Sequence, residues 1–297
     1  MTRKGRTKPV WQENITITGP YNFDEVIRRQ AFDPLHVLSL DERWVKVPLL
    51  IDHQPIVVKV QANGTTEQPS FIVTGSEEVK HETVIETLTE IFQWHAPIEG
   101  VYNHFQKTTL KVLFNEHFGA PLVLEFDPYG CLLKCIIHQQ LNMAFAHTLS
   151  TRFVHTFGYE VEGVWFYPRP ETVAQLKVEQ LRELQFSGRK AEYVIGIGKA
   201  IVEGQLDLEK IKPLTDEEVM KQMVKLRGVG PWTVQNFLLF GLGRSNLFPI
   251  ADIGIQNAIK KLFGMDRKPT IEEMEHYKQD WEPYLSYASL YLWRSIE

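Results

Sequence analysis

The chain contains little cysteine and no long apolar run, and both scarcities exclude whole classes of protein. Its only two cysteines, Cys131 and Cys135, stand four residues apart in a helical pattern, without Cys or His partners at zinc-finger spacing. We therefore expect two buried thiols that behave as small apolar side chains, and neither a disulfide nor a metal site. No apolar segment approaches the roughly 18 residues that a membrane span requires, so no membrane partner is expected.

The chain also lacks an excess of positive charge. It holds 32 Lys and Arg against 37 Asp and Glu, a formal net charge of −5. Since phosphate contacts are made by Lys and Arg, this balance weighs against nucleic-acid binding. The charge is uneven, however, because residues 185–268 contain 13 Lys and Arg against 9 Asp and Glu, a net of +4. The objection is therefore weaker for this segment.

The N-terminus is basic but has no apolar segment behind it. It lacks the pattern of a secretory signal, so we expect a cytoplasmic protein, associated with the nucleoid in a bacterium. Residues 1–12 are predicted to form a disordered basic tail.

What the chain does have is a change of character near residue 80. Before it, short β-rich runs dominate and one helix is predicted over 23–30; the runs are 15–18, 44–51, 55–60 and 71–74. After it, the periodicity is helical almost throughout. The pattern predicts an α+β fold with a small N-terminal α+β domain over residues 1–82 and a mainly helical domain over 83–297.

The helical part divides into segments at proline, glycine and polar capping residues. A capping box at 215–218 starts the helix that leads into the glycine-rich turn described next. The predicted helices are 81–93, 98–106, 109–117, 129–157, 171–176, 178–185, 188–203, 215–226, 231–241, 252–263, 271–279 and 284–295.

The most informative segment is a turn between two predicted helices, Leu226-Arg227-Gly228-Val229-Gly230-Pro231-Trp232-Thr233. Its two glycines permit positive φ and place no Cβ in the way of a ligand. The backbone N–H groups after the turn lie at a helix N-terminus, which favours an anion such as phosphate. The alternative is a tight corner between helices with no ligand.

An acidic residue, Asp252, follows Trp232 by twenty positions within the apolar sequence 248–255. A fixed carboxylate among apolar neighbours is a candidate catalytic group. The alternative is a helix N-cap that accepts a hydrogen bond from the N–H of Gly254 or Ile255. The two roles are compatible, because capping would hold the carboxylate in place.

These motifs resemble the helix-hairpin-helix–Gly/Pro–Asp motif of the endonuclease III superfamily of DNA glycosylases. The chain is most similar to the 3-methyladenine DNA glycosylase II type, which acts on alkylated bases. Further similar segments are Ile136–Gln140, Tyr167–Glu171, Leu181–Ala191 and Ser286–Trp293. The resemblance covers roughly residues 83–297. Residues 1–82 are compatible with the family's N-terminal domain, which is similar to the TATA-binding protein.

The resemblance implies a cofactor-free enzyme that excises alkylated bases from double-stranded DNA during base excision repair. It assigns catalysis to Asp252, which would stabilise positive charge on the deoxyribose and orient or deprotonate water. Family members that also cut the strand carry a nucleophilic Lys where this chain has Trp232. The resemblance therefore implies a monofunctional glycosylase, which we expect to be a monomer.

The resemblance also assigns the remaining site residues. The hairpin residues that contact DNA phosphate are Leu226, Gly228, Val229, Gly230 and Thr233. The base pocket comprises Trp232, Trp293, Ile253 and Asn236, and the side chain that fills the gap left by the flipped base is Gln140 or Leu141. For Trp232 and Trp293 the alternative is core packing, and for Gln140 it is an ordinary polar position on a helix.

No protein side chains are predicted to hold a metal, although hairpin backbone carbonyls in this family often hold a monovalent cation. Two alternative functions remain open from the sequence alone. One is an oxidised-purine glycosylase that acts on lesions such as 8-oxoguanine, which the missing Lys at position 232 disfavours. The other is a damage-binding module without catalysis, which the presence of Asp252 disfavours.

We predict that the protein forms no covalent adduct with damaged DNA. Trp232 offers no amine, so no imine forms for borohydride to reduce. The expected product is an abasic site whose strand breaks only after alkali treatment. Incubation with damaged duplex and borohydride, followed by a denaturing gel, makes the test. A trapped complex would show that another lysine is the nucleophile and would move the protein into the bifunctional class.

Overall fold

The computed structural model describes residues 10–76 and 80–296. Most of the predicted N-terminal tail, residues 1–9, lies outside the described residues. Residues 10–12 do not belong to a tail, because they pair with Gly75 and its neighbours as the start of strand β1. The hydrogen bonds of the sheet edge therefore fix this part of the chain.

A five-stranded antiparallel sheet forms the N-terminal layer, with the order β1-β5-β4-β3-β2. Its strands are β1 (Val10–Thr16), β2 (Val37–Ser39), β3 (Trp44–Ile51), β4 (Gln54–Ala62) and β5 (Ser70–Ser76). Asp52 and His53 join β3 to β4 with φ values of 49° and 62°. This is the two-residue hairpin turn that matches the right-handed twist of paired strands.

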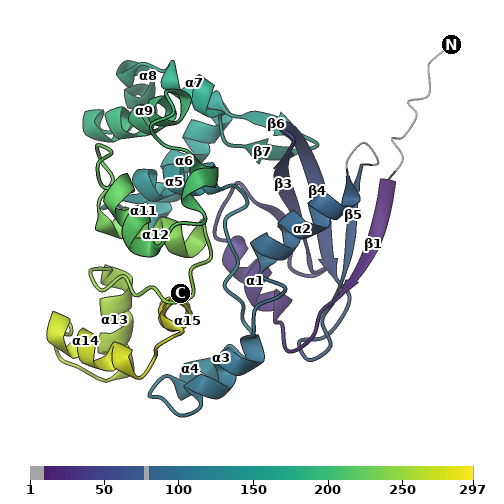
Figure 1. The fold of residues 1–297 in the computed structure, drawn as a ribbon, viewed down its shortest axis with the longest axis vertical. Coiled ribbons are helices and arrows are strands. Elements are labelled where there is room, and N and C mark those ends of the chain that lie inside the picture. Colours follow the sequence, from purple (N-terminus) through teal and green to yellow (C-terminus); the bar gives the residue numbers. More distant parts are fainter. Residues whose placement is uncertain (1–9, 77–79, 297) are drawn as a thin grey trace.

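Two helices, α1 (Phe23–Gln30) and α2 (His81–Phe92), cover one face of this sheet (Figure 1). Asn22 caps α1 by accepting a hydrogen bond from the N–H of Glu25. The core beneath them is aromatic, because the rings of Phe71 and Phe92 both stack on Trp94. The buried face of α2 shares this core, so α2 packs with the sheet. Most of α2 nevertheless lies beyond residue 82, where the predicted N-terminal domain ends.

The rest of the chain is a helical body with thirteen helices among the described residues. They are α3 (Ile98–Phe105), α4 (Lys111–Glu116), α5 (Pro128–His138), α6 (Met143–Phe157), α7 (Pro170–Ala174), α8 (Val178–Glu183), α9 (Gly188–Val202), α10 (Leu208–Ile211), α11 (Asp216–Met223), α12 (Pro231–Phe240), α13 (Ile253–Leu262), α14 (Ile271–Gln279) and α15 (Leu285–Arg294). The predicted α+β fold with a helical body is confirmed.

Helix α12 lies between the two apolar cores of this body. Its Phe237 and Leu238 belong to the core built mainly by α5–α11, whereas Leu239 belongs to the core built by α3, α4 and α13–α15. All three side chains are at most 1% exposed. The helix that begins at the glycine-rich turn is therefore fixed from both sides.

The prediction of one helix over residues 129–157 is wrong. The structure has α5 and α6 instead, separated by a turn in which Gln140 adopts a φ of 56°. The Asn142 side chain accepts a hydrogen bond from the N–H of Phe145 and so starts a new helix. Asn prefers this capping position to a helix interior, because its side chain competes for backbone partners.

A short hairpin, β6 (Tyr159–Val161) and β7 (Val164–Phe166), was also absent from the predicted helical pattern. Its turn residues Glu162 and Gly163 have φ values of 51° and 77°. The hairpin packs beside β3 and β4 (Figure 1), where Val164 and Phe166 bury Val57. It therefore connects the helical body to the N-terminal sheet.

Buried charges join the same two layers. The Lys134 ammonium on α5 contacts Asp33 Oδ2 at 2.7 Å and Glu125 Oε1 at 2.8 Å. Burial lowers the pKa of Lys134, but the two carboxylates outweigh this effect and raise it well above its ordinary value. With His36 these carboxylates have the spacing of a metal site, yet the ammonium already supplies the positive charge between them.

A second buried pair joins residues far apart in the chain. The Arg294 guanidinium at the end of α15 binds the Glu25 carboxylate of α1, and His117 Nδ1 lies 3.0 Å from the same carboxylate. Burial would raise the pKa of Glu25, but the hydrogen bond from His117 and the charge of Arg294 outweigh it and hold the pKa below its ordinary value. The pair therefore stabilises the ionised carboxylate.

Two expectations from composition can be compared directly with the structure. Cys131 and Cys135 are free thiols in buried positions, as predicted. Among the residues that the structure describes, no helix is both long and apolar enough to span a membrane.

Glu25→Gln should lower the free energy of unfolding by about 3 kcal/mol at neutral pH, because it removes one charge of a buried pair. Glu86→Gln, an exposed carboxyl on α2, is the matched control and should change little. Because the folded-state pKa of Glu25 is lowered, its stabilisation is present above the unfolded-state pKa and lost as the pH falls through the folded-state pKa. Denaturant unfolding of the wild type and the variant at pH 7 and below pH 4 measures the loss of unfolding free energy and its dependence on pH. An equal loss at the two pH values would contradict the stabilising ion pair.

Candidate active site

The candidate catalytic carboxylate, Asp252, is held by three N–H donors from three different elements. Asp252 is the N-cap of α13, and its Oδ1 accepts the N–H of Ile255 at 3.0 Å. The indole Nε1 of Trp293 donates to the same oxygen at 2.9 Å, and Nε1 of Trp232 donates to Oδ2 at 2.9 Å. Both carboxylate oxygens are therefore fixed in position.

The two tryptophans come from two different helices of the helical body. Trp232 lies in the first turn of α12, directly after the glycine-rich turn, and Trp293 lies near the end of α15. Gly254 allows Trp293 to approach, because a Cβ there would lie 3.0 Å from both the indole ring and Asp252 Oδ1. The N-cap interpretation of Asp252 is thus right, and it coexists with the indole contacts.

The other two predicted pocket residues differ in their surroundings. Ile253 is 62% exposed beside the carboxylate. Asn236 is buried, and its Nδ2 donates to the backbone carbonyl of Trp232 at 2.8 Å, which supports the first turn of α12. Ile253 therefore presents an apolar surface next to Asp252, whereas Asn236 supports the backbone that carries one indole.

One aromatic residue of the site was missed by the sequence argument. Phe240, one turn after Asn236 on α12, lies with its ring centroid 5.6 Å from that of Trp293. The Arg29 guanidinium of α1 lies 5.2 Å from the centroid of the Phe240 ring. The helical spacing of Asn236 and Phe240 was the available signal, since residues four apart share one face of a helix.

The glycine-rich turn joins α11 to α12, and its two glycines differ in conformation and surroundings. Gly228 has a φ of 89°, and a Cβ there would lie 2.2 Å from the ring of Tyr193. Gly230 has a φ of −105°, and no described atom lies within 4 Å of the position its Cβ would take. Gly228 thus makes the turn possible, whereas Gly230 leaves an open surface at the N-terminus of α12.

The predicted wedge turn lies against this hairpin. Gln139 Nε2 donates to the carbonyl of Gly228 at 2.8 Å and to Thr233 Oγ1 at 2.7 Å. Thr233 is 1% exposed, so its hydroxyl serves this contact within the protein. Gln140, next in the chain, is exposed. The structure therefore brings the predicted wedge and the predicted phosphate contact together.

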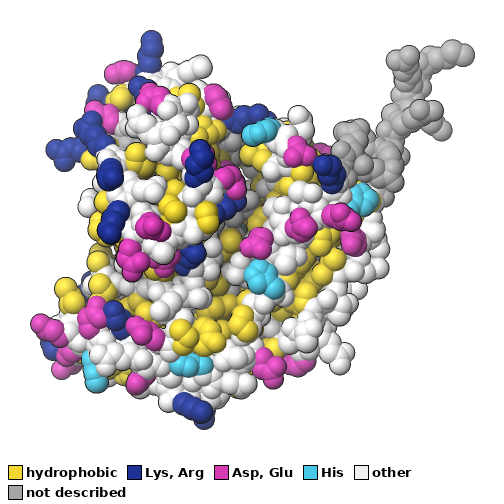
Figure 2. All heavy atoms as spheres, in the orientation of Figure 1, with side chains coloured by type: hydrophobic (Ala, Val, Ile, Leu, Met, Phe, Trp, Pro, Cys, Tyr) yellow, Lys and Arg dark blue, Asp and Glu magenta, His cyan; other side chains and the backbone are white. Residues whose placement is uncertain are grey.

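Positive charge surrounds this part of the surface. Figure 2 shows Lys and Arg side chains gathered along the edge of the helical half, whereas the sheet half in this view carries more Asp and Glu. Exposed cations at the start of α9 and around the hairpin include Arg189, Lys225 and Arg227. Arg227 pairs with Glu192 at 2.7 Å. The charge asymmetry found in the sequence is therefore present on the folded surface.

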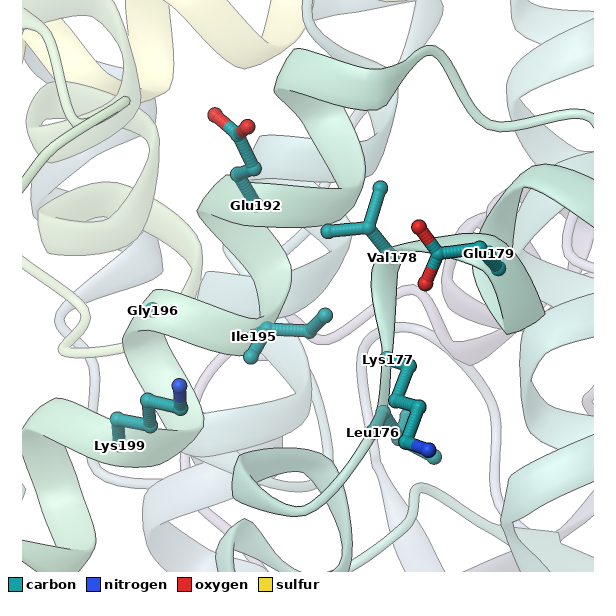
Figure 3. A pocket seen from close by; sticks show the side chains of 8 residues that line it. All are labelled: Leu176, Lys177, Val178, Glu179, Glu192, Ile195, Gly196 and Lys199. Carbon is teal, nitrogen blue, oxygen red and sulfur yellow. The ribbon is translucent and has the colours of Figure 1, made fainter.

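A groove of about 440 Å³ lies between α9 and the segment that begins α8 (Figure 3). Its lining includes Gly196 and Lys199, from the sequence Gly196-Ile197-Gly198-Lys199, which is superficially similar to a phosphate-binding loop. That sequence lies within α9. Because a helical backbone uses its N–H groups internally, it cannot wrap a phosphate as a loop does.

A family model described as the HhH-GPD superfamily of base excision DNA repair proteins matches residues 133–283. The putative DNA-3-methyladenine glycosylase YfjP of Bacillus subtilis is 51% identical over 97% of this chain and 100% of its own length. A DNA-3-methyladenine glycosylase of the same species is 32% identical and covers 74% of each chain. This chain therefore belongs to the HhH-GPD superfamily, as the sequence motifs predicted.

Solved structures share the whole fold. A 3-methyladenine DNA glycosylase from Archaeoglobus fulgidus superposes with a TM-score of 0.84 at 23% identity, over 95% of this chain and 97% of that one. A structure of MBOgg1 in complex with a low affinity DNA ligand gives a TM-score of 0.78 at 18% identity, over 98% of both chains. The N-terminal sheet and the helical body are thus one shared architecture.

Alanine at the two hairpin glycines should affect two different properties of the protein. Gly228→Ala should destabilise the fold by about 2 kcal/mol, because a side chain there is strained by positive φ and collides with Tyr193. Gly230→Ala should change stability by less than about 0.5 kcal/mol, yet weaken binding to every duplex alike if phosphate approaches this surface. Thermal unfolding and binding to matched and damaged duplexes measure the two effects. A loss at Gly230 confined to one lesion would contradict a phosphate contact.

Proposed function

We propose that this protein is a monofunctional DNA glycosylase that removes alkylated bases from double-stranded DNA by hydrolysis of the N-glycosidic bond, in base excision repair. The observation that carries the proposal is the Asp252 carboxylate fixed by the indoles of Trp232 and Trp293, next to an open glycine-rich hairpin. The relatives named DNA-3-methyladenine glycosylases support the same reaction and substrate class. We further propose that it acts as a monomer in the cytoplasm.

Asp252 would act on charge that develops during bond cleavage. As the base departs, positive charge grows on the deoxyribose, and a nearby carboxylate lowers the energy of that state. The three N–H donors fix the orientation of the carboxylate, so little reorganisation is needed during the reaction. A carboxylate fixed in this way suits an electrostatic role and the orientation of water.

Trp232 sets the outcome of the reaction. The residue donates from its indole to Asp252 Oδ2 and offers no amine that could attack the sugar. Water is then the nucleophile, and the product is an abasic site. The same feature disfavours an oxidised-purine glycosylase with strand-cleaving activity, although this chain shares its fold with an 8-oxoguanine glycosylase/lyase of Clostridium acetobutylicum.

Aromatic faces would receive the base. Trp232 and Trp293 are each only partly buried, so part of each ring surface is accessible beside the carboxylate. Many alkylated purines carry positive charge, and an electron-rich indole attracts a cation above its ring. Ile253 adds exposed apolar surface at the same place. A flipped alkylated base would therefore bind by stacking, with little hydrogen-bond discrimination.

The hairpin and the neighbouring turn would hold the DNA. The backbone N–H groups around Gly230, at the N-terminus of α12, suit a phosphate. Gln140, exposed in the turn after α5, would enter the duplex and fill the gap left by the flipped nucleotide, with Leu141 beside it. A monovalent cation at the hairpin carbonyls stays a prediction; the carbonyls of Leu226 and Gly228 already accept hydrogen bonds from Val229 and Gln139.

Asp252→Asn should lower the rate of base excision at least about 100-fold while duplex affinity stays within about threefold. Asn can still cap α13 through its Oδ1, so the fold should persist. Its Nδ2, however, carries no negative charge and meets the Trp232 N–H as a second donor. Single-turnover release of 3-methyladenine from a duplex makes the measurement, with Asp266→Asn, an exposed Asp after α13, as the control. Activity within threefold of the wild type would refute the catalytic role.

A further inference from the structure

Lys190, the third residue of α9, ends helix α5 with three hydrogen bonds. Its Nζ donates to the carbonyl oxygens of Ile136 at 3.0 Å, Ile137 at 2.8 Å and Gln139 at 3.0 Å. The last carbonyls of a helix lack partners within the helix, and its C-terminus favours positive charge. A lysine ammonium has three N–H groups, so all three are used on this one helix end.

Gln139 connects the same place to the hairpin. Its backbone carbonyl accepts from Lys190, whereas its side chain donates to Gly228 O and Thr233 Oγ1. The next residue, Gln140, has a φ of 56° and an exposed side chain. Gln139 is therefore held through both its backbone and its side chain, immediately before the exposed Gln140.

We propose that Lys190 is a positioning residue that sets the turn carrying Gln140 before DNA binds, and that Gln139 couples this turn to the phosphate-contacting hairpin. The assignment rests on the proposed function in taking Gln140 as the side chain that enters the duplex and the hairpin as the contact to phosphate. Ordering a residue requires about 1–2 kcal/mol of backbone entropy. A turn already ordered in the free protein removes that requirement from the base-flipping step.

The ammonium form matters, because only it has three N–H groups. Burial lowers the pKa of Lys190 to about 8. The titratable groups near it on α5 and α6 are His138 and His147, whose rings lie 5.1 Å apart, and burial lowers the pKa of both below their ordinary value. Both are therefore neutral above pH 7. The charged side chains nearby on α9 and the hairpin are Arg189 and Arg227.

Burial holds the pKa of Lys190 at about 8, so the ordered turn binds this proton more weakly than a solvated lysine would. Raising the pH through about 8 therefore does not oppose the ordered turn by linkage, and the three contacts are tested by substitution at a constant pH below 8, where Lys190 is an ammonium. Arginine at the same position keeps a positive charge and N–H donors.

The first experiment measures order in the free protein. Amide hydrogen exchange in a peptide covering residues 136–142 should be faster in Lys190→Met by at least about tenfold at constant pH. Lys199→Met is the matched control, since Lys199 lies exposed on the same helix at the groove of Figure 3. Equal exchange in Lys190→Met and the wild type would overturn the proposal whether or not the protein has glycosylase activity.

The second experiment measures the consequence for DNA. Lys190→Met should slow release of 3-methyladenine from a duplex by at least about tenfold, with little change on a single strand, because only a duplex has a gap to fill. Equal losses on both substrates would indicate a general structural role and overturn the proposal. If the wild type releases no base from either substrate, the proposed function fails, and the exchange experiment still decides the role of Lys190.

The third measurement is rescue by arginine. Lys190→Arg keeps a positive charge and N–H donors at the same position, so its amide exchange and duplex excision should lie closer to the wild type than those of Lys190→Met. Equal losses in Lys190→Arg and Lys190→Met would show that a cationic donor here does not set the turn, and would contradict the positioning role.

Discussion

The Asp252 carboxylate and its three N–H donors are the constraint on which the rest of the structure depends. The donors belong to α12, α13 and α15, so the carboxylate is held correctly only when these three helices are in place. Each helix is placed by a different part of the fold. Helix α12 lies between two cores, α13 packs on α15, and α15 is joined to the N-terminal layer through Arg294 and Glu25.

The distribution of charge explains how a nominally acidic chain can bind DNA. Binding of the backbone requires positive charge only where phosphate approaches, and cations gather around α9 and the hairpin. The acidic residues elsewhere include the buried Glu25 and Asp33 and the half-buried Glu125, which pair with internal cations. Total charge therefore describes this protein poorly, because the acidic and basic residues serve different regions of the molecule.

Sequence predicted the parts of the site that are set locally. The Gly-Val-Gly turn, the proline that starts α12 and the capping Asp252 each have a short-range pattern with a physical reason. The division of 129–157 into two helices was also locally signalled, by Asn142, but strong helical periodicity on both sides concealed it. The two-residue turn of β6 and β7 was missed for a similar reason, since strands of three residues have too few positions to show alternation.

Long-range partners could not be predicted in this way. Nothing in the spacing of Lys190 indicates that its ammonium would meet carbonyls about fifty positions earlier, and nothing near Glu25 indicates Arg294. Phe240 likewise has an ordinary helical context and acquires significance only through Trp293. Such contacts depend on how whole elements pack, and residue type with local spacing carries no information about that.

The position of Trp293 in the chain has a consequence for how the molecule is made. During synthesis the hairpin and Asp252 emerge from the ribosome before α15, and the buried Glu25 meets Arg294 only after α15 has been made. A chain that stops before α15 would thus contain the hairpin but not the second indole that fixes the carboxylate. The proposed contact to phosphate is therefore made before the proposed reaction centre is complete, and α1 must meet α15 for the buried ion pair to form.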